Sequence, residues 1–171
     1  KQLIQNILNG QSGIIANNKD VFAPRHPERN FAYFRENKTS AQEIYNGIFN
    51  DILYISPETT SCKLHLIDLK EAEGEIGLKA GAAEKYFAVI NIGDKREFIK
   101  LVEETAPDIT VQRAAISKSL FEDINEPNST INLLIGSKKF VEGWNSWRVS
   151  TMSLLYIGKG AGPQIIQLFG R

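Results

Sequence analysis

Three largely apolar runs, each followed by a glycine, constrain the fold of this chain most strongly. They cover residues 86–92, 131–135 and 149–157. Continuous apolar runs of this length are typical of strands that are buried on both faces of a parallel sheet. Helical patterns alternate with these runs, and the alternation predicts an α/β fold with a mainly parallel sheet flanked by helices.

The turn after the first apolar run predicts the start of a helix. Asp94 can act as the N-cap, with Glu97 at the third helical position. The expected buried face consists of Phe98, Ile99, Leu101 and Val102. Strand, turn and helix together form half of a βαβ unit. We therefore interpret Asp94 as a helix cap rather than as a catalytic acid.

Two further helices are predicted in the first third of the chain. The first covers residues 1–10. The second runs from about Ser40 to Leu53, where Ser40 and Glu43 form a capping box and an apolar stripe follows at helical spacing.

The middle of the chain changes between strand-like and turn-like patterns. Residues 62–69 largely alternate between apolar and polar side chains and predict a strand. Residues 70–79 are acidic and contain glycine, so we interpret them as a surface excursion. A short helix is predicted over residues 117–125 and a turn at 126–129.

Composition indicates a soluble globular lobe. The chain has 171 residues, of which 42% are hydrophobic and 23% charged. We interpret residues 36–171 as one lobe and residues 1–35 as an N-terminal segment of unclear role. No run approaches the roughly 20 apolar residues of a membrane span, so no membrane partner is expected. Cys62 is the only cysteine, which excludes an internal disulfide and favours a cytoplasmic location. Because the chain does not begin with Met, we expect a fragment of a longer protein.

Positive charge is concentrated in the last quarter of the chain. Lys plus Arg equals Asp plus Glu overall, at 20 each. Between Gly136 and Arg171 the one acid is Glu142, and the basic residues are Lys138, Lys139, Arg148, Lys159 and Arg171. Five positive charges and one negative charge leave a local +4, which suits phosphate groups. A solvated basic surface is the alternative interpretation.

Two polar loops in this quarter carry the candidate chemistry. Ser137 and the backbone amides after it can bond a phosphate oxygen, and Gly143 lets the backbone approach a ligand closely. Asn145 can hydrogen-bond a hydroxyl group. Gln167 and Arg171 lie four residues apart, hence on one face of a helix, and an arginine displayed in this way suits bidentate phosphate recognition. An exposed helix surface is the alternative for these two residues.

Several common nucleotide and metal motifs are absent from the sequence. A phosphate-binding P-loop needs G-x-x-x-x-G-K-[ST], which residues 77–85 do not match. His26 and His65 lie far apart and have no acidic or cysteine partners at ligand spacing, so no metal site is predicted. No G-x-G-x-x-G follows a strand and no acid–base pair is evident, which disfavours a small-molecule enzyme of doubly wound fold.

The two loops, in this order, resemble motifs of a family of motor proteins. Residues 137–145 resemble motif V of superfamily 2 helicases and translocases, which runs Thr, five residues, Gly, one residue, Asp. Residues 167–171, Gln-Leu-Phe-Gly-Arg, resemble the start of motif VI, Gln-x-x-Gly-Arg-x-x-Arg. Residues 131–171 as a whole resemble the Res subunit of type III restriction enzymes, and residues 86–94 and 119–125 resemble the same family.

The resemblance implies a role for each loop. The chain would be the second RecA-like lobe of an ATP-dependent DNA helicase or restriction motor, and the first lobe of the same parent chain would hold most of the ATP and Mg²⁺. Ser137 and Lys138 would face the DNA. The nucleotide would be contacted by Gly143, Asn145, Gln167 and Arg171. Gln167 and Arg171, the two implied catalytic residues, would project at the γ-phosphate, where an arginine stabilises developing charge. A methyltransferase subunit is a further possible partner.

Two departures of the sequence from this family pattern matter for function. Asn145 stands where many members have Asp, which removes a charge but keeps a hydrogen-bonding group. The chain also ends at Arg171, before the second arginine of motif VI, so the isolated fragment is expected not to hydrolyse ATP.

Two interpretations stay open. A RecA-like domain kept as a non-catalytic scaffold or interaction module is the alternative function. Trp144 and Trp147 suit stacking on bases, and their packing on the sheet edge of the lobe itself is the alternative.

Overall fold

The computed structural model describes residues 41–59, 62–114, 118–136 and 146–152. The chain divides into two compact units, Lys1–Thr60 and Ser61–Arg171, which are described separately. The predicted boundary between residues 35 and 36 stays a prediction. So does the predicted helix over residues 1–10, which lies outside the described residues.

The first unit contains the predicted helix after residue 40. Helix α4 covers Ala41–Gly47 and continues as a π-helix over Ile48–Ile52, so the predicted helix is confirmed but its last turn is wider than an α-helical turn. The backbone N–H of Leu53 donates to the oxygen of Ile48 over 3.0 Å. The rings of Tyr45 and Phe49 lie 4.5 Å apart and give this helix its apolar contact. The capping box begins at Ser40, which lies outside the described residues.

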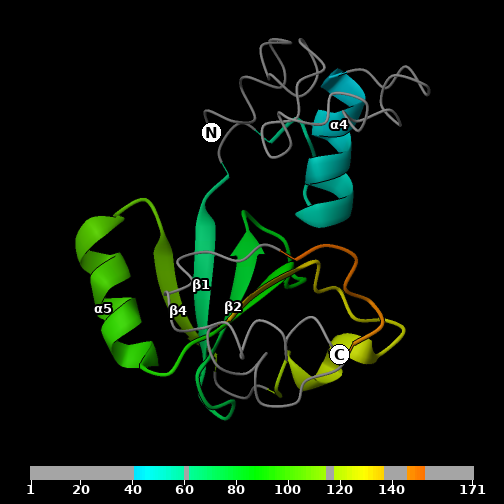
Figure 1. Ribbon diagram of the computed structural model, residues 1–171. Coiled ribbons are helices and arrows are strands. Elements are labelled where there is room, and N and C mark those ends of the chain that lie inside the picture. The colour runs from blue at the N-terminus through cyan, green and yellow to red at the C-terminus, as the bar shows by residue number, and fades with distance from the viewer. Residues whose placement is uncertain (1–40, 60–61, 115–117, 137–145, 153–171) are drawn as a thin grey trace, which may run out of the picture. The chain divides into compact units, whose positions relative to one another are not determined.

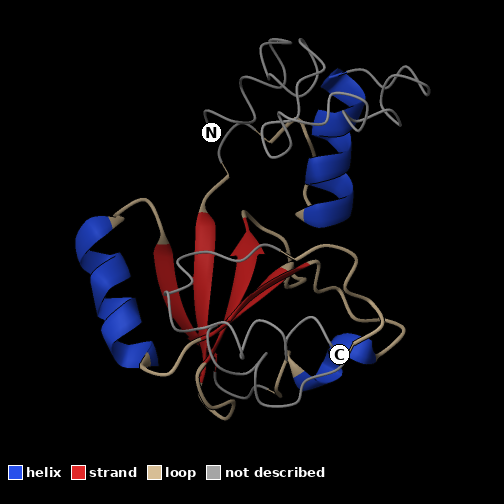
Figure 2. Ribbon diagram, viewed as in Figure 1, coloured by secondary structure: helices blue, strands red, loops and turns tan. Residues whose placement is uncertain are grey.

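The second unit is built on a five-stranded sheet. The strands are β1 (Leu64–Leu69), β2 (Glu75–Ala80), β3 (Ala88–Asn91), β4 (Thr110–Ala114) and β5 (Leu133–Gly136). Their order across the sheet is β4-β1-β2-β3-β5 (Figures 1 and 2). The pairs β1·β4 and β3·β5 are parallel, whereas β2 is antiparallel to both of its neighbours. The α/β expectation is met by this mixed sheet, but the expectation of a mainly parallel sheet is not.

Strand β2 corrects the interpretation of residues 70–79 as a surface excursion. Its burial is nearly complete, although it contains Glu75, Gly77 and Lys79. A Cβ atom added to Gly77 would lie 2.5 Å from the ring of Tyr86, so the strand passes the aromatic ring at a distance that only glycine allows. The polar residues that suggested solvent exposure have internal partners instead, as described below for Glu75.

Helix α5 (Lys95–Thr105) confirms the helix predicted after Gly93, and it lies beside β4 (Figure 1). Its expected buried face is only partly buried: no residue of the helix is fully buried, and Leu101 is 53% exposed. After α5 the chain enters β4, a strand that the sequence analysis did not predict and that pairs with β1 rather than β3. The βαβ connection therefore passes over two strands of the sheet.

Among the described residues of the second unit, two clusters of buried apolar side chains include residues of the sheet. One contains Val89, Phe121, Ile124 and Ile131, and the other contains Ile67, Leu69 and Ala72. Tyr86 and Leu120 pack against both. Of the short helix predicted over residues 117–125, only the last four residues are helical, as the 3₁₀-helix η3 (Glu122–Asn125); residues 118–121 are not helical. The backbone N–H of Ser129 donates to the oxygen of Glu126 in the predicted turn.

Of the last two predicted strands, the first is present in the structure and the second is absent over its described residues. Strand β5 is confirmed, but it is not the buried strand expected, because Leu133 and Ile135 are 46% and 45% exposed. Residues 149–152 form no strand, so the strand predicted over 149–157 is wrong at its start, and residues 153–157 lie outside the described part of the chain. No helix in the described residues is long and apolar enough to cross a membrane.

Candidate functional site

The residues that the sequence analysis assigned to DNA, nucleotide and catalysis all lie outside the described residues. They are Ser137, Lys138, Gly143, Asn145, Gln167 and Arg171. Their assignments stay predictions. The residues on either side of the first loop, Gly136 and Ser146, are described and define where that loop begins and ends.

The loop begins at the carboxyl edge of the parallel strands. Strands β1, β3, β4 and β5 all run in the same direction, so their carboxyl ends lie at one edge of the sheet. Gly136, the last residue of β5, stands opposite Asn91 of β3, and the chain then enters Ser137. Open α/β sheets place ligands at this edge. The topology therefore brings Gly136, the last described residue before the predicted DNA-facing segment, beside the turn that follows β3.

That turn is fixed by Asp94 in the role the sequence indicated. Its carboxylate accepts a hydrogen bond of 2.9 Å from the backbone N–H of Glu97, which satisfies a free donor at the start of α5. Gly93, just before it, is exposed and has no atom within 4 Å of the position of a Cβ.

Lys95, the first residue of α5, contacts the chain at the end of β1, at the same edge of the sheet. Its Nζ lies 2.8 Å from Oδ1 of Asp68 and donates to the backbone oxygens of Leu69, at 2.9 Å, and Ala72, at 3.4 Å. A lysine at a helix start is disfavoured by the helix dipole, so these three acceptors hold it there. They tie the turn between β1 and β2 to α5, and they leave the ammonium group occupied by the protein itself.

Glu75 is a buried carboxylate that the sequence analysis did not single out. Its side chain accepts from the hydroxyl of Ser119 over 2.6 Å and from the backbone N–H groups of Leu120 and Phe121 over 2.9 and 3.3 Å. Glu75 is 1% exposed. These hydrogen bonds attach the segment before η3 to the start of β2, so the carboxylate organises the sheet rather than a ligand site. Its partners lie more than 40 residues away, and no local pattern signals them.

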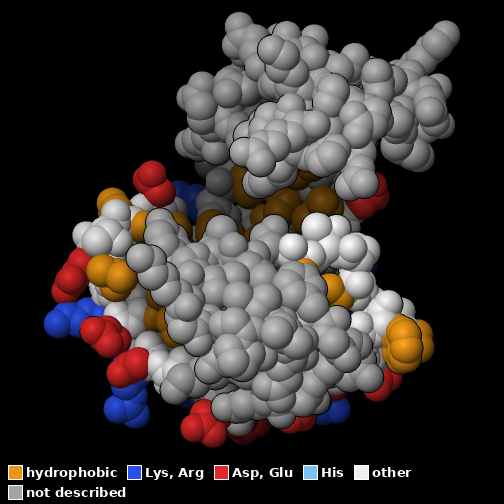
Figure 3. Space-filling view, viewed as in Figure 1, with side chains coloured by type: hydrophobic (Ala, Val, Ile, Leu, Met, Phe, Trp, Pro, Cys, Tyr) orange, Lys and Arg blue, Asp and Glu red, His pale blue; other side chains and the backbone are white. Residues whose placement is uncertain are grey.

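Arg148 was counted in the sequence analysis among the basic residues suited to phosphate. In the structure its Nη1 donates to the backbone oxygen of Ile124 over 2.7 Å and its Nη2 donates to that of Ser129 over 3.3 Å. The guanidinium is therefore engaged by the turn that follows η3. In the described part of the face shown in Figure 3, acidic and basic side chains are interspersed around the rim.

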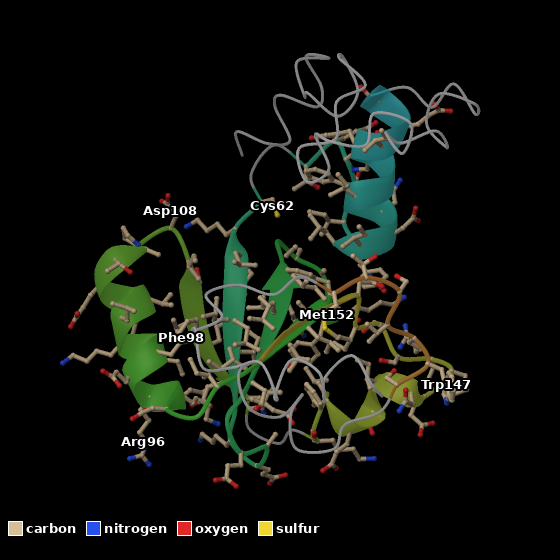
Figure 4. The ribbon with its side chains drawn as sticks, in the orientation of Figure 1. Cys62, Arg96, Phe98, Asp108, Trp147 and Met152 are labelled. Carbon is tan, nitrogen blue, oxygen red and sulfur yellow. The ribbon has the colours of Figure 1, made fainter. Side chains whose placement is uncertain are left out.

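Trp147 is nearly fully exposed. Its side chain points away from the sheet beside η3 (Figure 4), and 96% of its surface is accessible. The alternative that Trp147 packs on the sheet edge is therefore wrong, while Trp144 lies outside the described residues. Three exposed acids, Glu122, Asp123 and Glu126, stand on the neighbouring segment, which does not favour an approach by nucleic acid.

Among the described residues, Tyr86 is the one whose pKa departs clearly from its ordinary value. Burial raises its pKa above the ordinary 10.0, because the ionised ring would lose its hydration. The ammonium of Lys79 lies 4.5 Å from the ring centroid. Since Tyr86 also packs against both core clusters, its role is one of packing.

In the described part of the chain, no three His, Cys, Asp or Glu side chains lie together in a way that would hold a metal ion. Nδ1 of His65 lies 3.4 Å from Nε2 of Gln112, and His26 is outside the described part.

Comparison with known proteins identified no relative: no family model, no curated protein and no solved structure matches this chain.

Proposed function

We propose that this chain is the second motor lobe of an ATP-dependent DNA helicase or translocase of the type III restriction enzyme kind. In this role it completes an ATP site held mainly by the first lobe of the same parent chain. It also contacts the DNA backbone.

The observation that carries the proposal is the pair of segments 137–145 and 167–171. The first resembles motif V and the second resembles the start of motif VI, in the family order. Support comes from the position of the first segment, which directly follows β5 at the carboxyl edge of the parallel strands.

A RecA-like fold of the lobe is part of the proposal. The parallel pairs β1·β4 and β3·β5, and the helix α5 after β3, are in keeping with such a fold. The antiparallel strand β2 in the middle of the sheet is not typical of it, and the proposal has to accommodate β2 as a departure.

In the proposal, two residues contact DNA and four contact ATP. Ser137 and Lys138 bond the phosphate backbone of DNA. Gly143 and Asn145 contact ATP, which is bound with Mg²⁺ mainly by the first lobe. Gln167 and Arg171 project at the γ-phosphate, where the guanidinium stabilises negative charge on the transferred phosphoryl group. Closure of the two lobes on ATP would then report the state of the nucleotide to the DNA.

The test is the ATPase activity of the full-length parent with and without duplex DNA. We expect DNA to stimulate hydrolysis, and Arg171→Ala to lower the stimulated rate by about 10²-fold or more, because the charge on the phosphoryl group loses its partner. Arg96→Ala, an exposed arginine of α5, is the matched control.

Two results would contradict the proposal. A folded parent that hydrolyses no ATP under either condition would favour the alternative, a non-catalytic RecA-like scaffold. A stimulated parent in which Arg171→Ala has no effect would keep the motor but remove Arg171 from its site.

A further inference from the structure

We draw no further inference here: the strongest candidate, the surface patch in which the nearly fully exposed Trp147 projects beside the three exposed acids of residues 122–126 on and after η3, is a single exposed ring next to an acidic cluster, and nothing in the described residues shows what covers it.

Discussion

Strands β2 and β5 differ in burial, and each differs from what its sequence suggests: the polar strand β2 is buried and the apolar strand β5 is exposed. Strand β2 contains a glutamate, a lysine and a glycine, yet it lies in the middle of the sheet and is almost entirely buried. Strand β5 reads Leu-Leu-Ile-Gly, yet it is the last strand of the sheet in the described residues and is largely exposed. The comparison shows that the apolar pattern indicates a strand, while the place of the strand in the sheet determines how much of it is buried.

The largest effect is expected from truncating isoleucines in the two strands. Ile76 of β2 is 0% exposed and Ile135 of β5 is 45% exposed. Ile76→Ala should lower the free energy of unfolding by about 3–4 kcal/mol, because it leaves a cavity in a packed core. Ile135→Ala should cost only about 1 kcal/mol, since nearly half of that residue's surface is already hydrated in the folded protein. Urea unfolding of both variants checks the difference, and equal losses would remove the contrast between the strands.

A smaller effect is expected at Glu75, which tests why a charged residue is tolerated in β2. Glu75→Ala removes the acceptor of the Ser119 hydroxyl and of two backbone N–H groups, so it should lower the free energy of unfolding by about 2–3 kcal/mol. Glu71→Ala, an exposed acid before the same strand, is the control and should change it by less than about 0.5 kcal/mol. Similar values for the two acids would show that the buried carboxylate does not hold the segment before η3.

The smallest effect concerns the pH dependence of stability at Tyr86, the ring that covers Gly77 of β2. Burial raises the pKa of Tyr86 in the folded state above the 10.0 of the unfolded chain. The folded state therefore retains a proton that the unfolded state releases, and stability falls as the pH rises above about 10. Tyr86→Phe should weaken this fall. Unfolding free energies at pH 8 and above pH 10 test the effect, and an identical fall in both proteins would exclude Tyr86 as its source.

Local signals in the sequence predicted much of the fold correctly. The cap of α5 depends on Asp94 and Glu97, three residues apart, and both the cap and the helix are present as predicted. Strands β1, β3 and β5 were recognised from their apolar residues. Strand β4 was missed because its pairing with β1 joins residues far apart in the sequence, and because Gln112 and Arg113 within it are exposed.

The candidate site was predicted from motifs and only its boundaries are described by the structure. The motif-like segments indicated where to look, and β5 leads directly into the first of them. The charge count included Arg148 as a phosphate group's partner, whereas the structure assigns its guanidinium to two backbone oxygens 24 and 19 residues away. A count of charges cannot separate an arginine that binds a ligand from one that binds the chain.

The sequence alone determined strands β1, β3 and β5 and the position where α5 begins, because those features depend on patterns of residues a few positions apart. The tertiary structure decided the antiparallel direction of β2, the burial of Glu75 and the engagement of Arg148. Each of these depends on hydrogen bonds between segments far apart in the chain, such as the one that joins Glu75 to Ser119 across 44 residues. The partners of such bonds become neighbours only when the whole sheet has formed.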